Sequence, residues 1–431
     1  MQQRTSPAKL LLFVLLVGGI VAFWYWRGSY GAIGQVSRLD FSTVDHIAFL
    51  RKENGKVDLF LAKADGSEIR PFTSDGRMKR GLAWSPDGKR LCFTAELRDQ
   101  NSTAYQLFLL GAGDVRQATY GSLSKDAPAW SPDGKHIAFL AGGSSRVMSP
   151  NAAESRQVYP PPHKSAAQEM SGGDHDHDHS SSQPGEGETG FRKAPITRFR
   201  WAPNSISIAG RQETEGEFAL TRGEAEWWQK PARTKSGSEM TVMPAESAVV
   251  LRSITESAVI QLPGGDRVTF DWFPDSKRLL LAVSGPGDSH GLIAFRVDER
   301  GLPPGPLVLA GKGAYSFMNP VVSPDGSRVA FELWREAKGG DREMVGLAIV
   351  PGTLERPIVL SGESDLAQVS FAVKGDAHEP SWSPDGTRLL YWSNRGNGRD
   401  YFVVPAAGGE PTCVTGRVGD NFAAVWSPAK K

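Results

Sequence analysis

The eleven residues Ala83–Phe93, with the sequence A-W-S-P-D-G-K-R-L-C-F, decide the fold of this 431-residue chain because they recur along it. Residues 129–139 and 381–391 repeat the pattern, and Val321–Phe331 keeps S-P-D-G with a valine in place of the tryptophan. Altered or shortened copies are W-A-P-N at 201–204, W-F-P-D at 272–275 and W-S-P at 426–428. A motif that returns this often is one structural unit copied around an array.

The S-P-D-G sequence predicts a turn between two strands. Proline presets the backbone angle of the second turn position, serine and aspartate bond to local backbone, and glycine takes the left-handed conformation. The residues after the turn, such as Lys135–Phe139, alternate polar and apolar and so predict a strand. Each copy is therefore interpreted as a hairpin, in which one strand ends at the tryptophan, a type I turn follows and the next strand begins.

The tryptophan-equivalent positions give the number of units. They are 84, 130, 201, 272, 322, 382 and 426, at separations of 44 to 71 residues. A four-stranded propeller blade needs about 40–45 residues. The spacing therefore predicts an all-β fold, a β-propeller of seven four-stranded blades. Six blades would result if one altered copy forms no blade, and eight if the interval 201–272 hides a degenerate one.

The two ends of the chain predict how the ring closes. His46–Leu50 and Val57–Leu61 have the pattern of strands in a first blade that lacks its innermost strand. Ala424–Pro428, at the other end of the chain, supplies the missing piece. Pairing of the N- and C-terminal strands would close the ring and leave no open sheet edge.

The first 27 residues predict a membrane segment. Leu10–Trp26 is uncharged and mostly apolar, and Arg4 and Lys9 precede it. As a helix, this segment would span about 26 Å, close to the roughly 30 Å hydrocarbon core of a bilayer. We expect an uncleaved signal-anchor at residues 1–27, with the N-terminus in the cytoplasm and the propeller in the periplasm or outside the cell. A cleaved signal peptide is the alternative.

The remaining composition indicates one exported domain. Residues 28–43, with scattered glycines, have the composition of a tether, and residues 44–431 form the propeller. The formal net charge of +1 argues against a nucleic-acid partner. Two cysteines do not make a disulfide framework. We expect the chain to be a monomer.

One long insertion, residues 143–192, interrupts the propeller. It is rich in Ser, Gly, Pro and His and has hardly any apolar periodicity, which predicts a disordered loop. Its histidines alternate with aspartates at His175, His177 and His179. In an extended segment the three imidazoles point the same way and can hold a divalent metal ion loosely. A solvated polar loop is the simpler interpretation, and we expect no other cofactor.

Residues 382–415 carry the unit in its fullest form. Trp382–Gly386 reads W-S-P-D-G, Ser393–Gly396 reads S-N-R-G, and G-G-E and V-T follow at 408–410 and 414–415. This pattern resembles the WD-like β-propeller repeat of the TolB family. The resemblance implies an extracytoplasmic propeller that offers its channel mouth to a protein or peptide. The chain departs from TolB proper, because about 15 residues between the apolar segment and the first strand leave no room for TolB's small α/β domain.

The residues just before each tryptophan are those that a propeller tends to turn toward its central channel. Charged and amide side chains at these steps are what a polar channel rim would use to bind a partner. The rim residues predicted in this way are Arg80, Asp126, Arg198, Asn319, His378, Glu379 and Asn421. The alternative is that these groups satisfy neighbouring backbone or bind water.

We expect no enzymatic activity. Similar propellers precede the catalytic domain of prolyl-oligopeptidase-type peptidases, but no α/β-hydrolase pattern accompanies these repeats. The predicted function is therefore a membrane-anchored scaffold that binds a protein or peptide at the cell envelope. The alternative is a propeller enzyme or small-molecule binder that uses a polar or metal-containing central channel, with His378, Glu379 and Asp126 as its only plausible residues.

Overall fold

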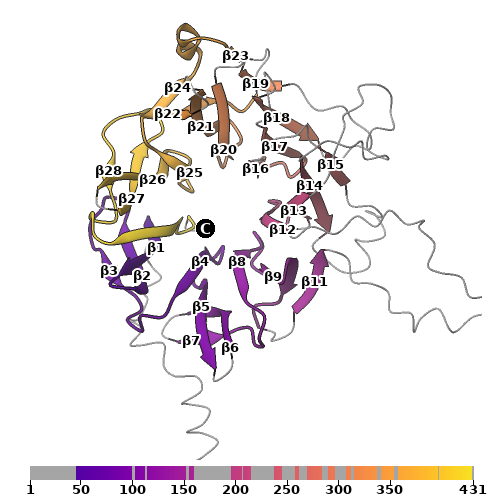
Figure 1. Ribbon diagram of the computed structural model, residues 1–431, viewed down its shortest axis with the longest axis vertical. Helices are drawn as coiled ribbons and strands as arrows, with labels where there is room; N and C mark the ends of the chain where they lie inside the picture. The colour runs from indigo at the N-terminus through magenta and orange to yellow at the C-terminus, as the bar shows by residue number, and fades with distance from the viewer. Residues whose placement is uncertain are drawn as a thin grey trace, which may run out of the picture.

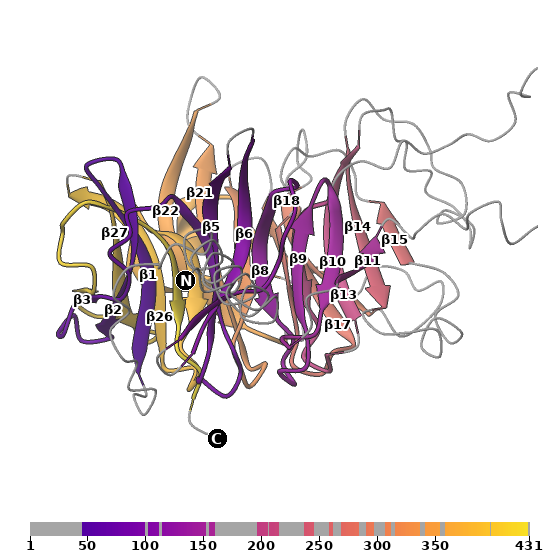
Figure 2. The same cartoon turned by 90° about the horizontal axis from the view of Figure 1, so that it is seen from below.

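The structure of the chain is a computed structural model, which describes residues 45–99, 102–111, 114–151, 155–159, 196–205, 207–214, 237–244, 258–261, 269–283, 290–296, 307–311, 315–336, 341–353, 358–396 and 398–429. Its strands form seven sheets, which are set around a common centre as the blades of a propeller (Figure 1). Seen from the side, the strands run across the thickness of the disc from one face to the other (Figure 2).

Four blades consist of four consecutive strands each, so the chain completes one blade before it starts the next. Blade 2 holds β4 (Lys79–Trp84), β5 (Leu91–Asp99), β6 (Ser102–Leu110) and β7 (Val115–Gln117), and blade 3 holds β8 (Lys125–Trp130), β9 (Ile137–Ala141), β10 (Ser144–Met148) and β11 (Ser155–Tyr159). Blade 4 holds β12 (Ile196–Trp201), β13 (Ser207–Thr214), β14 (Gly237–Pro244) and β15 (Ala258–Gln261), and blade 7 holds β25 (His378–Trp382), β26 (Arg388–Gly396), β27 (Gly398–Pro405) and β28 (Thr412–Cys413). The first strand of each blade is the innermost (Figure 1).

Blade 1 joins the two ends of the described chain. It holds β29 (Asp420–Trp426), β1 (His46–Glu53), β2 (Lys56–Lys63) and β3 (Arg70–Pro71), in that order. Strands β29 and β1 pair antiparallel, with Trp426 opposite Ile47. The Ser427 N–H donates to the His46 carbonyl at 2.7 Å, and the His46 N–H donates to the Ser427 hydroxyl at 3.0 Å. The predicted pairing of the terminal strands is therefore confirmed.

Blades 5 and 6 are joined by a strand exchange. Blade 5 holds β16 (Thr269–Trp272), β17 (Arg278–Val283), β18 (His290–Arg296), β19 (Leu307–Gly311) and, at its edge, β23 (Ile358–Leu360). Blade 6 holds β20 (Tyr315–Val322), β21 (Arg328–Glu336), β22 (Arg342–Pro351) and β24 (Ser370–Lys374), and the 3-10 helix η2 (Glu363–Gln368) lies between β23 and β24.

The predicted fold of seven four-stranded blades is wrong in this region, because blade 5 has five strands. After β22 the chain crosses back to the neighbouring blade, and β23 pairs parallel with β19, with Ile358 opposite Leu309. It then returns through η2 to complete blade 6. This excursion accounts for the long spacing between Val322 and Trp382, which the sequence pattern alone did not explain.

The predicted transmembrane helix at Leu10–Trp26 lies outside the described residues, as do the tether and most of the histidine-rich insertion. Where the chain is described, no helix is long and apolar enough to cross a membrane, and η2 is the single helix there. The described elements therefore include no transmembrane helix, contrary to the predicted fold.

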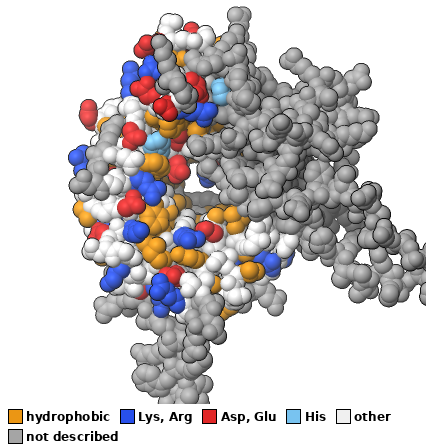
Figure 3. Space-filling view, viewed as in Figure 1, with side chains coloured by type: hydrophobic (Ala, Val, Ile, Leu, Met, Phe, Trp, Pro, Cys, Tyr) orange, Lys and Arg blue, Asp and Glu red, His pale blue; other side chains and the backbone are white. Residues whose placement is uncertain are grey.

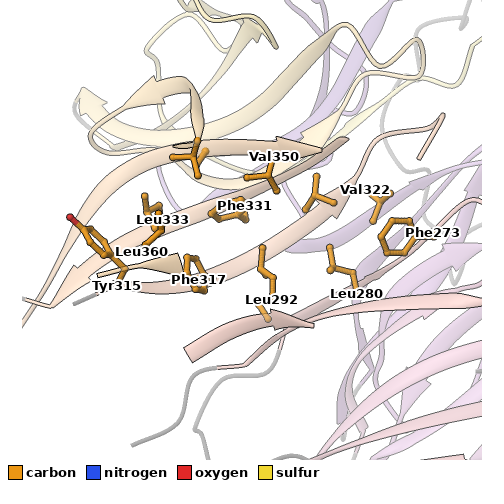
Figure 4. Close-up of a cluster of buried hydrophobic side chains, with 14 residues drawn as sticks. Phe273, Leu280, Leu292, Tyr315, Phe317, Val322, Phe331, Leu333, Val350 and Leu360 are labelled. Carbon is orange, nitrogen blue, oxygen red and sulfur yellow. The ribbon is translucent and has the colours of Figure 1, made fainter. Parts of the chain in front are cut away.

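The core lies between the blades, because each inner strand and its neighbours bury both faces. In β1, Ile47 and Phe49 pack toward blade 7, whereas Ala48 and Leu50 pack toward blade 2. All four side chains are completely buried. Since successive strand residues point to opposite faces, one apolar run serves two cores. Figure 4 shows the core between blades 5 and 6, where Phe273 and Leu280 face Phe331 and Val350.

The S-P-D-G turns have the predicted geometry. In blade 2 the Gly88 N–H donates to the Ser85 carbonyl at 2.8 Å, and Gly88 has a φ of 68°, in the left-handed region. The Ser85 hydroxyl donates to Asp87 Oδ1 at 2.5 Å. The same bonds recur at the turns that begin with Ser131, Ser323 and Ser383.

Each turn also places a basic or aromatic side chain on the tryptophan of the next blade. Arg90 lies 4.7 Å from the ring centroid of Trp130, and Arg388 lies 5.3 Å from that of Trp426. Arg328 and Trp382, and His136 and Trp201, form the equivalent contacts. In blade 5 the next blade offers Val322 instead of a tryptophan, and Arg278 stacks on Phe273 of its own blade, at 4.1 Å.

Replacing Arg388 with alanine is expected to lower the free energy of unfolding by about 1–2 kcal/mol, because both a cation–π contact and a partly buried ion pair are lost. Arg388 Nη1 lies 3.0 Å from Asp45 Oδ2, next to the closing strand β1. Urea denaturation monitored by tryptophan fluorescence measures the change.

The control variant is Arg342→Ala, which breaks an ion pair at 2.8 Å to Glu336 without an aromatic partner. It is expected to cost less than about 0.5 kcal/mol. Equal losses in the two variants would contradict a role for Arg388 in closing the ring.

Candidate partner-binding site at the channel mouth

The seven inner strands all end at the S-P turns or their altered copies, so their starts lie together on the opposite face, which we call the channel mouth. Five of these strands carry a residue in the left-handed region three positions before the tryptophan step, and the strand register shifts there. A bulge of this kind re-aims the side chains on either side of it. The five residues are Gly81, Ala127, Asn319, Glu379 and Ala423, with φ between 47° and 54°.

Two of the predicted rim residues meet at this mouth. The Arg80 guanidinium on β4 lies 3.8 Å from the Asp126 carboxylate on β8, and the two side chains are 52% and 49% exposed. Arg80 also stacks on Tyr105 at 3.9 Å, and Asp126 Oδ1 accepts the Ala127 N–H at 2.8 Å. The bulges therefore present an exposed, oriented pair of opposite charges.

A second ion pair between neighbouring blades, with Arg200 exposed and Asp271 half-buried, lies at the turn ends of the inner strands and was missed by the sequence analysis. Arg200 on β12 lies 3.8 Å from Asp271 on β16, and Asp271 also accepts the Val322 N–H at 3.0 Å. Both residues stand directly before the tryptophan of their blade, at Trp201 and Trp272. A charged residue directly before the tryptophan was the sequence signal that could have identified this pair.

Asn319, His378 and Glu379 are brought together by Glu332, a β21 residue that is 2% exposed. Its Oε1 accepts the Asn319 Nδ2–H and the Glu379 backbone N–H, both at 2.7 Å. Its Oε2 accepts the Trp334 Nε1–H at 3.0 Å. One buried carboxylate thus holds two of the bulge residues in place. Burial opposes its charge, but the groups bonded to it together hold the pKa of Glu332 below its ordinary value.

His378 lies between two carboxylates and two indole rings. Its Nε2 is 2.8 Å from Asp376 Oδ1, and its Nδ1 is 3.9 Å from Glu332 Oε2. The imidazole stacks on Trp392 at 4.2 Å and faces Trp334 at 5.6 Å. Burial works against the charged imidazole, but the two carboxylates outweigh it and raise the pKa of His378. Because both ring nitrogens face carboxylates, the ring has no nitrogen available to act as a general base.

Of the remaining predicted rim residues, Asn421 contributes no exposed group. Asn421 is completely buried, where its amide donates to the Arg399 and Val418 carbonyls and to Asp400. It joins blades 1 and 7 and offers no surface to a partner. The side chain of Arg198, on β12, lies outside what the structure describes, and so do His175, His177 and His179.

The described residues contain no group of three or more His, Cys, Asp or Glu side chains that could hold a metal ion. Residues 287–291 read G-D-S-H-G and match the nucleophile-elbow pattern, which the sequence analysis overlooked. His290 and Gly291 lie in β18 of a propeller blade, not at a strand-to-helix turn that such a serine requires. The remaining residues of the pattern lie outside the described ranges.

The surface at the mouth is mixed in character. Figure 3 shows the disc hollowed near its centre, with charged and hydrophobic side chains bordering the hollow on the side of the described blades. The chain is thus a β-propeller whose inner strands present polar groups to a central opening.

The comparisons with known proteins concern the fold. No family model matches the chain, and no curated protein matches it. TolB from Acinetobacter baumannii is similar in structure, with 16% identity, a TM-score of 0.45, and coverage of 96% of this chain and 72% of that one. The propeller resembles that of the family whose repeat its W-S-P-D-G motifs share.

Two other solved structures illustrate the range of similar propellers. An oligogalacturonate lyase in complex with manganese has 11% identity and a TM-score of 0.42, over 83% of this chain and 96% of that one. A prolyl endopeptidase structure has 11% identity and a TM-score of 0.49, and the match spans 88% of this chain and 50% of that one. These similarities concern overall fold, so the site is interpreted from its own geometry.

Replacing Glu332 with glutamine is expected to lower the free energy of unfolding by about 2 kcal/mol, because the amide cannot accept all the bonds that the buried carboxylate accepts. The urea midpoint measures the loss. Glu336→Gln, which weakens a half-buried surface ion pair to Arg342 at the end of the same strand, is the control and is expected to change the midpoint little. Similar shifts in both variants would contradict the role of Glu332 as a buried acceptor.

His378 predicts a pH dependence of stability. Because its folded-state pKa is raised, its contribution is fully present below its unfolded pKa of about 6.5. The contribution is lost as the pH rises through the folded-state value. The stability difference between the wild type and His378→Gln should therefore shrink between pH 6 and pH 9, as measured by urea denaturation at a series of pH values. A difference that stays constant or grows with pH would contradict this prediction.

Proposed function

We propose that this protein is a binding scaffold that takes a protein or peptide partner at its channel mouth. The observation that carries the proposal is that the same backbone bulge recurs in several inner strands and presents different side chains in different blades. The same bulge recurs in blades 1, 2, 3, 6 and 7, yet it presents a cation–carboxylate pair in blades 2 and 3 and amide and carboxylate groups in blades 6 and 7. Such a surface offers distinct contacts at fixed spacings, which is what specific recognition requires.

The chemistry of the mouth supports binding more than catalysis. His378 has carboxylates at both ring nitrogens, and Asp126 is paired with Arg80. Groups whose charges are already balanced orient a partner but have little capacity to move a proton.

A second candidate function, small-molecule binding, is favoured by a cavity of about 630 Å³ under η2 at the edge of blade 6. Its lining includes Tyr315, Leu366 and Phe371, together with the ion-paired Arg335 and Glu343. Its volume lies within the range of about 300–1,000 Å³ typical of ligand pockets. The cavity lies between η2 and blade 6, and none of the bulge residues lines it.

We place the propeller at the cell envelope, held to the membrane through the apolar segment 10–26. This location rests on the sequence, which has basic residues before that segment and an uncharged stretch long enough to cross a bilayer. Membrane fractionation, together with protease accessibility of the propeller in spheroplasts, tests the location.

Capture experiments with the full chain as bait test the scaffold. A partner that depends on the mouth should be recovered from membrane extract by the wild type and reduced at least about fivefold by the double change Arg80→Ala and Asp126→Ala, because both oriented charges are lost. The control is the double change Lys63→Ala and Glu68→Ala, which removes an exposed ion pair of blade 1 on the face opposite the mouth, where Lys63 lies across from His46. A partner lost equally from both baits, or no partner at all, would contradict binding at the mouth.

A further inference from the structure

Glu379 differs from the other acidic residues of the inner strands. Asp126 and Asp271 each lie 3.8 Å from an arginine. The Glu379 side chain is exposed, and its carboxylate has no ion pair or hydrogen bond to any residue that the structure describes. Among the described residues, the Glu379 carboxylate at the channel mouth therefore has no counter-charge.

This carboxylate is held in a costly position. Glu379 has a φ of 49°, a left-handed conformation that L-residues with a side chain adopt only at a cost. Blade 2 shows the unstrained solution at the equivalent step, where Gly81 has a φ of 54°. At this step of blade 7 the chain thus has a charged side chain where a glycine would fit the backbone more easily.

The neighbouring residues hold the backbone of Glu379 in place. Its backbone N–H donates to the buried Glu332 carboxylate at 2.7 Å. The preceding residue, His378, is stacked against Trp392 and paired with Asp376, and the following residue is the buried Pro380. The carboxylate is therefore presented from a rigid base, which lowers the entropy cost of pairing it with a partner's charge.

We propose that Glu379 is the recognition group for a basic residue, lysine or arginine, in a peptide segment of the partner. The proposal rests on the proposed function and names the chemistry of its partner at blade 7. Charge complementarity selects the cation. The commitment to a peptide follows from the mouth as a whole, because the Arg80–Asp126 pair on blades 2 and 3 gives an extended occupant further polar contacts beyond a single ion.

The test uses the full chain and two fluorescein-labelled decapeptides, one alternating glycine with lysine and the other glycine with glutamate. Fluorescence anisotropy at about 20 mM salt, where screening is weak, should show binding of the lysine peptide only. Glu379→Gln should weaken that binding about fivefold. Glu410→Gln, at an exposed carboxylate on the outer side of blade 7, should leave it unchanged.

A second variant separates recognition from structure. Glu379→Gly removes the carboxylate and relieves the left-handed strain, so it should raise Tm by about 2 °C while it weakens binding of the lysine peptide as much as Glu379→Gln does. A merely structural role for the side chain predicts no change in binding. Unchanged binding in both Glu379 variants would overturn the proposal, as would equal binding of the glutamate peptide.

Other outcomes show which of the two proposals fails. If millimolar Mg²⁺ displaces the peptide completely and binds with the same dependence on Glu379, the occupant is a free cation and the peptide proposal is overturned. If a captured partner depends on Arg80 and Asp126 but not on Glu379, the inference fails while the proposed scaffold stands. If the lysine peptide binds at Glu379 but no partner depends on the mouth, the scaffold proposal fails instead.

Discussion

At four of the seven junctions between neighbouring blades, the indole N–H of the motif tryptophan donates to the backbone of the blade before it, and this contact ties those blades of the ring together. Trp201 Nε1 donates to the Ala129 carbonyl at 3.1 Å, and Trp382 Nε1 donates to the Val321 carbonyl at the same distance. Trp272 and Trp426 make the equivalent bonds to Arg200 and Ser381. In all four bonds the acceptor is the residue directly before the tryptophan, or before Val322, of the previous blade. The bond therefore fixes the register between neighbouring blades and also holds them together.

The same contact explains why the motif is W-S-P-D-G and not a turn sequence alone. The tryptophan bonds backward to the previous blade, and the basic residue after the turn stacks forward on the next tryptophan, as Arg90 does on Trp130. Each unit is therefore incomplete by itself and complete in an array, which is the physical basis of repeat folds. Where blade 6 substitutes Val322, the forward stack is lost and Asp271 bonds to the Val322 N–H instead.

Much of this fold is predictable from sequence, because a turn with proline and glycine at fixed places and a tryptophan before it leaves few options. The strand β23 is not predictable in that way, since its pairing with β19 is nonlocal and Ile358–Leu360 is too short to show a period. The site is predictable only in part. Arg80 and His378 stand four residues before the tryptophan, directly next to the bulge. Asn421 stands five residues before it, and the residues at that position in blades 2 and 3, Lys79 and Lys125, are buried as well. Glu332 gave a weak signal, a carboxylate within the apolar run V-A-F-E-L, and only the fold shows what it binds.

The central claim is that the chain recognises a partner with the starts of its inner strands. Hydrogen–deuterium exchange of the full chain, free and with its captured partner, measures this most directly. The account predicts that binding slows exchange in peptides that cover Lys79–Trp84, Lys125–Trp130 and His378–Trp382, with little change in the outer strands. Protection confined to the outer strands or to η2, with the inner strands unaffected, would contradict it.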